Sequence, residues 1–173
     1  MFETVVECLV KRKTPLKAYV GRSAIIFFDF LLLMVIYFLA LAASAFMFAA
    51  VFIIALGIIL TYVVFTRTDL EYEYSFYDGE MRVDKIMHKS SRKKLHTFNF
   101  GKMDFMAPEG SHHLGGTVSN RKKYDYSAGD EESVNYVAVL YDENNTAVEL
   151  LFTPNEELLE RLNKTYPRKV YQD

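Results

Sequence analysis

The sequence predicts a membrane protein in two parts: a transmembrane α-helical hairpin and a mainly-β, α+β domain that ends in a helix. Three observations predict this fold class. The 42 residues from Ala24 to Phe65 contain one charged side chain. Beyond residue 67, large apolar residues recur at every second position, as they do in half-buried strands. Near the end of the chain, leucines recur at the spacing of an amphipathic helix.

Charge is distributed unevenly along the chain. Residues 1–22 carry five basic and two acidic side chains, whereas residues 66–173 carry fifteen basic and nineteen acidic ones. The single cysteine, Cys8, excludes a disulfide within the chain and fits a reducing compartment. The apolar run is far longer than the 7–15 residues of a signal-peptide core, which predicts a permanent membrane segment.

The first part, residues 1–22, is interpreted as an amphipathic interfacial helix with a basic flank. Its apolar residues recur at helical spacing: Phe2, Val5, Val6, Leu9 and Val10. Such a helix is suited to an anionic membrane surface. The protein's own cytoplasmic domain is an equally good partner for its apolar side.

The second part, residues 23–66, is predicted to form two transmembrane helices. One continuous helix would be roughly 63 Å long at 1.5 Å per residue. The hydrocarbon core is about 30 Å thick and a span needs about 20 residues. We therefore expect spans near 24–43 and 46–65, with a turn near 42–45. The alternative is a buried hairpin in a soluble protein, but a core helix usually keeps a polar side.

The charged flanks predict the orientation of this hairpin. Basic residues precede the first span, Arg67 follows the second, and the turn between them has no charge. By the positive-inside rule, both termini are expected in the cytoplasm of a multi-pass plasma-membrane protein.

Asp29 is the one intramembrane carboxylate, and such residues are functional candidates by default. A small accessory subunit of a membrane transporter or complex would turn Asp29 toward a partner helix. The alternative is structural: near the cytoplasmic end of the span, Asp29 can reach interfacial water or pair with Arg22 or Lys17.

The third part, residues 67–173, is predicted to be a cytoplasmic antiparallel domain. Asp78-Gly79 supplies the turn of a first hairpin. Strands are expected at 70–76, 81–87, 95–100, 102–106, 134–141 and 147–152. A long loop, 107–132, interrupts them, with one short strand expected near Thr117-Val118. Thr153 as N-cap, Pro154 in the first turn and Glu156 as its capping-box partner predict a final helix.

These patterns resemble the pleckstrin-homology-like (PH-like) fold, an antiparallel sandwich or barrel with a C-terminal helix. The resemblance rests on Tyr74-Ser-Phe-Tyr-Asp-Gly79, on the Lys-rich turn 89–94 that leads into a strand, and on the capped terminal helix. It covers about residues 68–166. The whole chain is similar to small membrane proteins of Gram-positive, Clostridia-type bacteria that carry such a domain after a helical hairpin. The resemblance implies no activity.

Four basic residues form the candidate binding site: Lys89, Arg92, Lys93 and Lys94. Donors at this density can hold a phosphate or an anionic lipid headgroup. The resemblance implies the same, because basic loops of the first hairpins are recurrent contact points in this fold. The alternative is a solvated turn whose charges aid solubility.

Little in the sequence suggests catalysis. It contains no phosphate loop, zinc ligand set or nucleophile elbow. His112 and His113 are weak metal candidates and the weakest basis for an enzyme acting on lipid. We expect no cofactor, and net acidity disfavours nucleic acid. The sequence therefore predicts a non-enzymatic binding or scaffold module for a lipid bilayer headgroup or a protein partner, with the accessory subunit as the alternative.

Overall fold

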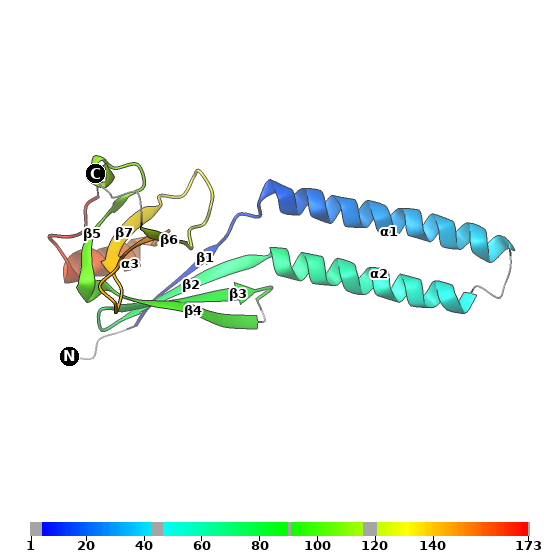
Figure 1. Cartoon of the computed structure of the whole chain (residues 1–173), viewed down its shortest axis with the longest axis horizontal. Coiled ribbons are helices and arrows are strands. Elements are labelled where there is room, and N and C mark those ends of the chain that lie inside the picture. The colour runs from blue at the N-terminus through cyan, green and yellow to red at the C-terminus, as the bar shows by residue number, and fades with distance from the viewer. Residues whose placement is uncertain (1–4, 43–46, 90, 116–120, 173) are drawn as a thin grey trace. The chain divides into compact units, whose positions relative to one another are not determined.

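The computed structural model of the 173-residue chain describes residues 5–42, 47–89, 91–115 and 121–172 (Figure 1). The chain divides into two compact units. One combines Met1–Lys13 with Leu70–Asp173, and the other is Thr14–Asp69. The predicted boundary, with a domain confined to residues 67–173, is therefore wrong. The helical segment is inserted between the first two strands of the sheet unit.

Residues 6–11 form a strand, β1 (Val6–Lys11), so the amphipathic helix predicted within residues 1–22 is wrong there. β1 pairs antiparallel with β2 (Leu70–Tyr77). Val6 and Cys8 are buried in the core, whereas Leu9 is 60% exposed. Because this exposed position holds an apolar residue, the sequence does not show the alternation of apolar and polar residues that is typical of a strand. The partner strand lies beyond the helical insertion, so no local pattern reveals the pairing.

Two four-stranded sheets make up the sheet unit. The first has the order β1-β2-β3-β4, with β3 at Glu80–Met87 and β4 at Ser91–Asn99. The second has the order β5-β7-β8-β6, from β5 (Met103–Pro108), β6 (Lys122–Asp125), β7 (Tyr136–Tyr141) and β8 (Ala147–Phe152). Among the described strands, all pairings are antiparallel except that of β6 with β8. The prediction of antiparallel sheets is confirmed, while Thr117-Val118 lies outside the described residues.

The final helix, α3 (Glu156–Thr165), closes the core, as predicted. Its N-cap is Asn155, whose side-chain oxygen accepts a hydrogen bond from the Leu158 amide at 2.9 Å. The predicted cap, Thr153, has its hydroxyl engaged elsewhere, accepting from the Ala128 amide at 2.9 Å. Leu158 and Leu162 are fully buried against the sheets, where aromatic residues fill the interior: Tyr74, Phe76, Phe100 and Phe152.

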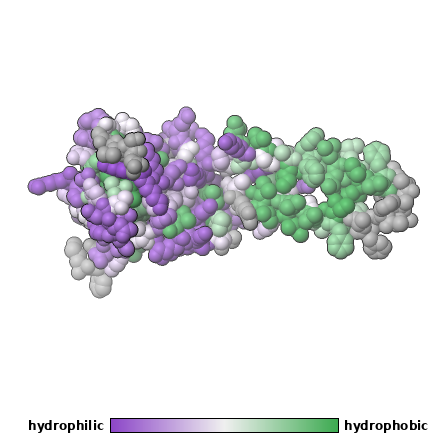
Figure 2. All heavy atoms as spheres, in the orientation of Figure 1, coloured by the Kyte–Doolittle hydropathy of each residue, from purple (hydrophilic) through white to green (hydrophobic). Residues whose placement is uncertain are grey.

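The helical unit contains α1 (Leu16–Ala42) and α2 (Met47–Thr68). By length and composition, Leu16–Leu39 is a candidate membrane span, and a shorter apolar stretch of α2 covers Ala50–Thr66. Hydrophobic residues cover the surface of these helices (Figure 2). Residues 43–46 of the predicted turn lie outside the described residues.

Candidate functional site

Basic side chains gather on the β3–β4 hairpin, where the sequence predicts an anion site. The structure separates the four predicted residues. Lys89 lies in the turn with a positive φ of 55°. The other three lie on β4, which begins at Ser91 because strand pairing continues as far as Met87: Arg92, Lys93 and Lys94.

Arg92 has a structural partner on β2, two strands away in the same sheet. Its Nη2 lies 2.7 Å from Oε2 of Glu73, a carboxylate whose side chain is 10% exposed. Arg82 pairs in the same way with Asp84, at 2.5 Å between Nη2 and Oδ2. Buried carboxylates require a counter-charge, and removing it is strongly destabilising. Arg92 is therefore engaged in holding Glu73 in the sheet, which sets it apart from the lysines around it.

Lys85 joins the site, although sequence reasoning missed it. On the paired strands Lys85 lies directly opposite Lys93. Like charges at opposed positions destabilise a sheet. Among the described residues neither ammonium has a carboxylate within 4.0 Å. The signal that could have found Lys85 is the hairpin register, once the β3–β4 turn is placed at His88-Lys89. Lys85, Lys89 and Lys93 are here called the lysine cluster. Lys94, the remaining predicted residue, lies opposite Asp84 on β3, and as the next residue after Lys93 on the strand it faces the other side of the sheet.

The lysine cluster lies at one end of its sheet. Met87 pairs with Leu70, the first residue of β2. Leu70 follows the last residue of α2, Thr68, by two positions along the chain. The end of the sheet that carries the β3–β4 turn is therefore the end at which β2 begins.

Asp29 finds its partner on the other helix. Its Oδ2 accepts a hydrogen bond from the Thr61 hydroxyl at 2.6 Å. A Cβ at Gly57 would lie 3.0 Å from Asp29 Oδ1, so the glycine makes room for the carboxylate. The predicted partner Arg22 instead donates from Nε to the Thr68 hydroxyl at 2.8 Å. These contacts join α1 to α2 within one chain.

His112 and His113 lie on a short 3-10 turn, His112–Leu114. Their ring centroids are 3.9 Å apart, and the ring of His113 stacks on Tyr171 at 4.0 Å. Among the described residues, no group of three or more histidine, cysteine or acidic side chains is arranged to hold a metal ion. The two histidines are therefore parts of an aromatic stack in this structure.

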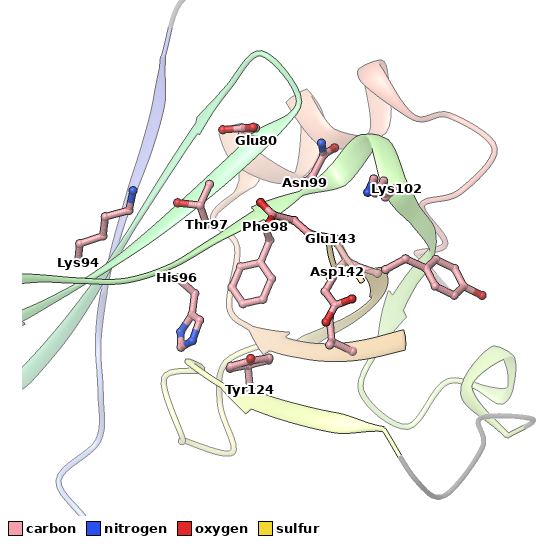
Figure 3. Close-up of a pocket in the computed structure, with 13 residues that line it drawn as sticks. Glu80, Lys94, His96, Thr97, Phe98, Asn99, Lys102, Tyr124, Asp142 and Glu143 are labelled. Atoms are coloured by element: carbon pink, nitrogen blue, oxygen red, sulfur yellow. The ribbon is translucent and has the colours of Figure 1, made fainter. Parts of the chain in front are cut away.

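A cleft of about 470 Å³ lies between β4, β6 and the β7–β8 turn (Figure 3). Three aromatic rings form its wall. The centroid of Tyr124 lies 4.5 Å from that of His96 and 5.4 Å from that of Phe98. Sequence reasoning missed this cleft, because His96 and Phe98 belong to an ordinary strand pattern and Tyr124 lies in the predicted loop.

Burial shifts the pKa values of two side chains at this wall, His96 and Tyr126. Desolvation, and then the positive charge of Lys122, lower the pKa of His96. The ring is therefore neutral near pH 7. Burial raises the pKa of Tyr126 to about 12, so its hydroxyl keeps its proton. The two side chains share a hydrogen bond of 2.6 Å between His96 Nδ1 and Tyr126 Oη.

Comparison with known proteins identifies one relationship. Residues 2–172 match a family model described as a bacterial PH-like domain (DUF6106). This match includes β1 as well as the strands after the helical segment. No curated protein and no solved structure matches the chain.

Proposed function

Because the chain belongs to the bacterial PH-like domain family, whose fold suggests a binding module, we propose that it is a membrane-anchored, non-enzymatic binding protein. The helices α1 and α2 form its anchor as a transmembrane hairpin. Both termini lie on the cytoplasmic side of the plasma membrane, as the positive-inside rule predicts. The sheet unit contacts an anionic lipid headgroup, or a protein partner at the same surface. The observation that carries this proposal is the β2–β3 register, which places the lysine cluster at the end of the sheet where β2 begins.

The points at which the chain leaves and re-enters the sheet unit support two crossings of the membrane. The Arg12 amide donates to the Leu70 carbonyl at 2.9 Å, so the chain leaves and re-enters the sheet unit at adjacent backbone positions. A membrane segment with both ends on one side crosses an even number of times. With 27 and 22 residues, α1 and α2 would be about 40 Å and 33 Å long at 1.5 Å per residue. Each length exceeds the hydrocarbon core of about 30 Å.

The position of the lysine cluster along the sheet supports it as the lipid contact. Two residues of chain span at most about 7 Å, which limits how far Leu70 can lie from the end of α2. Met87 is the strand partner of Leu70, so Lys85 and Lys89 belong to the end of the sheet at which β2 begins. The field of anionic lipids acts over a Debye length of about 8–10 Å. Each lysine near such a surface contributes about 1 kcal/mol.

The test is hydrogen–deuterium exchange of the full chain in nanodiscs of phosphatidylcholine, with and without phosphatidylglycerol. We expect the amides of residues 85–94 to exchange more slowly on the anionic discs, and 0.5 M salt to abolish the difference. Charge reversal of the cluster, K89E/K93E, should also abolish it. K164E/R168E is the matched control, since it makes the same change of four charge units at two exposed positions on and just after α3. Equal exchange of wild type and K89E/K93E would overturn lipid contact by this surface.

Arg92 needs separate treatment in this experiment. Reversing it would unpair Glu73 as well as remove a positive charge. A quadruple variant including Arg92 would therefore confuse loss of binding with loss of structure. Restricting the substitutions to Lys89 and Lys93 keeps the two effects apart.

The second candidate, an accessory subunit of a membrane complex, would use Asp29. A pocket of about 200 Å³ lies beside this carboxylate, lined otherwise by Leu32, Leu33, Ile54, Gly57 and Ile58. Intramembrane carboxylates mark functional sites by default. The Thr61 hydrogen bond gives Asp29 a use within its own chain, which favours the first proposal.

A further inference from the structure

We propose that the cleft between β4, β6 and the β7–β8 turn binds an aliphatic ammonium group, carried by a lysine side chain or by a free organic amine. This site is separate from the lysine cluster and takes a ligand of the opposite charge. The proposal stands on the aromatic wall, the acidic rim and a contact that the chain already makes with its own ammonium group.

The aromatic wall offers ring faces to a cation. Cations are attracted to the faces of tyrosine and phenylalanine rings within about 6 Å of the centroid. Lys122 already uses one of them, with its Nζ 4.9 Å from the centroid of Tyr124. Contact with Tyr124, and more weakly the charge of Asp142, raise the pKa of Lys122. Lys122 is exposed and is not itself a lining residue of the cleft, so its side chain can leave the ring of Tyr124 to a ligand from solution.

The rim of the cleft adds carboxylates to the aromatic wall. Three of its lining residues are acidic: Glu80, Asp142 and Glu143. Figure 3 shows Asp142 on the same side of the space as the rings of Phe98 and Tyr124. Its Oδ1 is held by the Thr146 amide at 2.8 Å, which fixes the orientation of the carboxylate. Within the described part of the chain, none of the three has a basic nitrogen within 4.0 Å. Their charge is available to a ligand.

The positive groups around the cleft do not cancel this charge. Lys94 and Lys102 also border it. Figure 3 shows Lys94 extending away from the aromatic wall. The ring of His96 is neutral, for the reasons given above. Three carboxylates therefore face one remaining border lysine and the displaceable Lys122.

The size and the apolar part of the cleft suit an alkyl chain. A volume of about 470 Å³ falls within the range of about 300–1,000 Å³ typical of small-molecule sites. Leu140 and Val148 line its inner part. Aliphatic carbons can pack there while the ammonium group meets the ring faces and carboxylates at the rim.

The test is a titration of the full chain in detergent micelles, followed by the NMR signal of His96 Cε1–H and assigned with H96Q. The probes are n-butylammonium, butyrate, n-butanol and inorganic phosphate. We expect a saturable shift with n-butylammonium only. D142N/E143Q should weaken its affinity about threefold or more, as expected for losing exposed charge pairs. Y124L should weaken it about two- to fivefold through loss of the ring face.

Lys122→Met gives the sharpest result, because the sign of its effect identifies the ligand charge. Removing the internal competitor should tighten n-butylammonium binding about two- to fivefold. If the cleft binds anions, the same variant should weaken butyrate or phosphate. Anion binding of that kind, absence of a saturable shift, or n-butylammonium binding insensitive to D142N/E143Q would each overturn the proposal.

A second titration separates the two sources of the ammonium group. Nα-acetyl-lysine methylamide carries the peptide groups that flank a lysine in a protein. Tighter binding of this probe than of n-butylammonium would indicate a peptide ligand, and equal binding a free amine. Circular dichroism checks that each variant keeps its fold, which for Lys122→Met is expected because the side chain is exposed.

Discussion

The two units use the same apolar residue types in opposite ways. In the sheet unit, Tyr74, Phe100 and Phe152 are fully buried. In the helical unit, Phe28 and Phe52 are 59% and 80% exposed. Burying apolar surface from water contributes about 25 cal/mol per Å². Soluble monomers rarely expose contiguous apolar patches of more than a few hundred Å². Under the proposed function, the difference teaches that each unit is matched to a different solvent, water for the sheets and lipid for the helices.

Polar groups follow the same division. In the sheet unit, the buried carboxylates of Glu73 and Asp84 are each neutralised by an arginine. In the helical unit, Asp29 meets only a hydroxyl, that of Thr61, within hydrogen-bond distance among the described residues. Such interhelical hydrogen bonds and close approach at small residues are the means by which helices associate in lipid.

Excising the helical unit is the strongest way to break this comparison. A short Gly-Ser linker should replace residues 14–69, because Arg12 and Leu70 are hydrogen-bonded neighbours. We expect the purified chain to change from detergent-dependent to water-soluble while keeping its near-ultraviolet circular dichroism. Removing residues 1–13 as well should abolish the fold, since Val6 and Cys8 belong to the core. A full-length chain that is soluble without detergent would contradict the assignment of solvents.

Matched phenylalanine truncations sharpen the comparison at single residues. Phe152→Ala removes a fully buried ring that meets Tyr74 edge to face at 5.8 Å. It should lower the free energy of unfolding of the sheet unit by about 3–5 kcal/mol. Phe28→Ala, on α1, should leave that value within about 0.5 kcal/mol, as for surface substitutions. Chemical denaturation in micelles, followed by tyrosine circular dichroism, measures both. Equal losses would show that Phe28 is buried.

Local patterns predicted the strands and hairpins whose partners are close in sequence. Alternation from Leu70 and the Asp78-Gly79 turn predicted the β2–β3 hairpin, which the structure contains with the expected turn. β1 was missed because its partner follows the insertion, and a short apolar run fits a helix as well as a strand. Asn155 replaced Thr153 as the cap because the Thr153 hydroxyl is engaged by Ala128, a contact between distant segments.

The candidate site also has a part that local sequence predicted and a part that depends on contacts between distant segments. Composition revealed the basic stretch 89–94, which is a local property of the sequence. It could not reveal that Arg92 pairs with Glu73 or that Lys85 lies opposite Lys93, since both depend on strand register. The cleft draws residues from four separate segments, so no single stretch of sequence carries its signature.

The contact between the helices allows a smaller test of the helical unit as the proposed membrane anchor. Thr61→Val removes the hydroxyl that donates to Asp29 and should cost about 0.6 kcal/mol, at most about 1.7, in helix association. Asp29→Asn should cost less, because its amide oxygen can still accept this hydrogen bond. Thermal unfolding in micelles with a donor–acceptor dye pair on the helix ends measures both. A larger cost for Asp29→Asn would indicate that the charge serves another partner, as the accessory-subunit function requires.

The smallest expected effect is a pH dependence in the sheet unit, from His96. Its folded pKa is lowered by desolvation and by Lys122, below the unfolded value of about 6.5. The unfolded chain therefore binds the proton more readily, and stability decreases as pH falls from about 6.5 through the lowered pKa. His96→Gln should lose this part of the acid sensitivity. The readout is the difference in melting temperature between variant and wild type from pH 7.5 to 5. A constant difference across this range would mean that the hydrogen bond to Tyr126, rather than burial, controls the ring, because that bond can be kept by either partner as the donor.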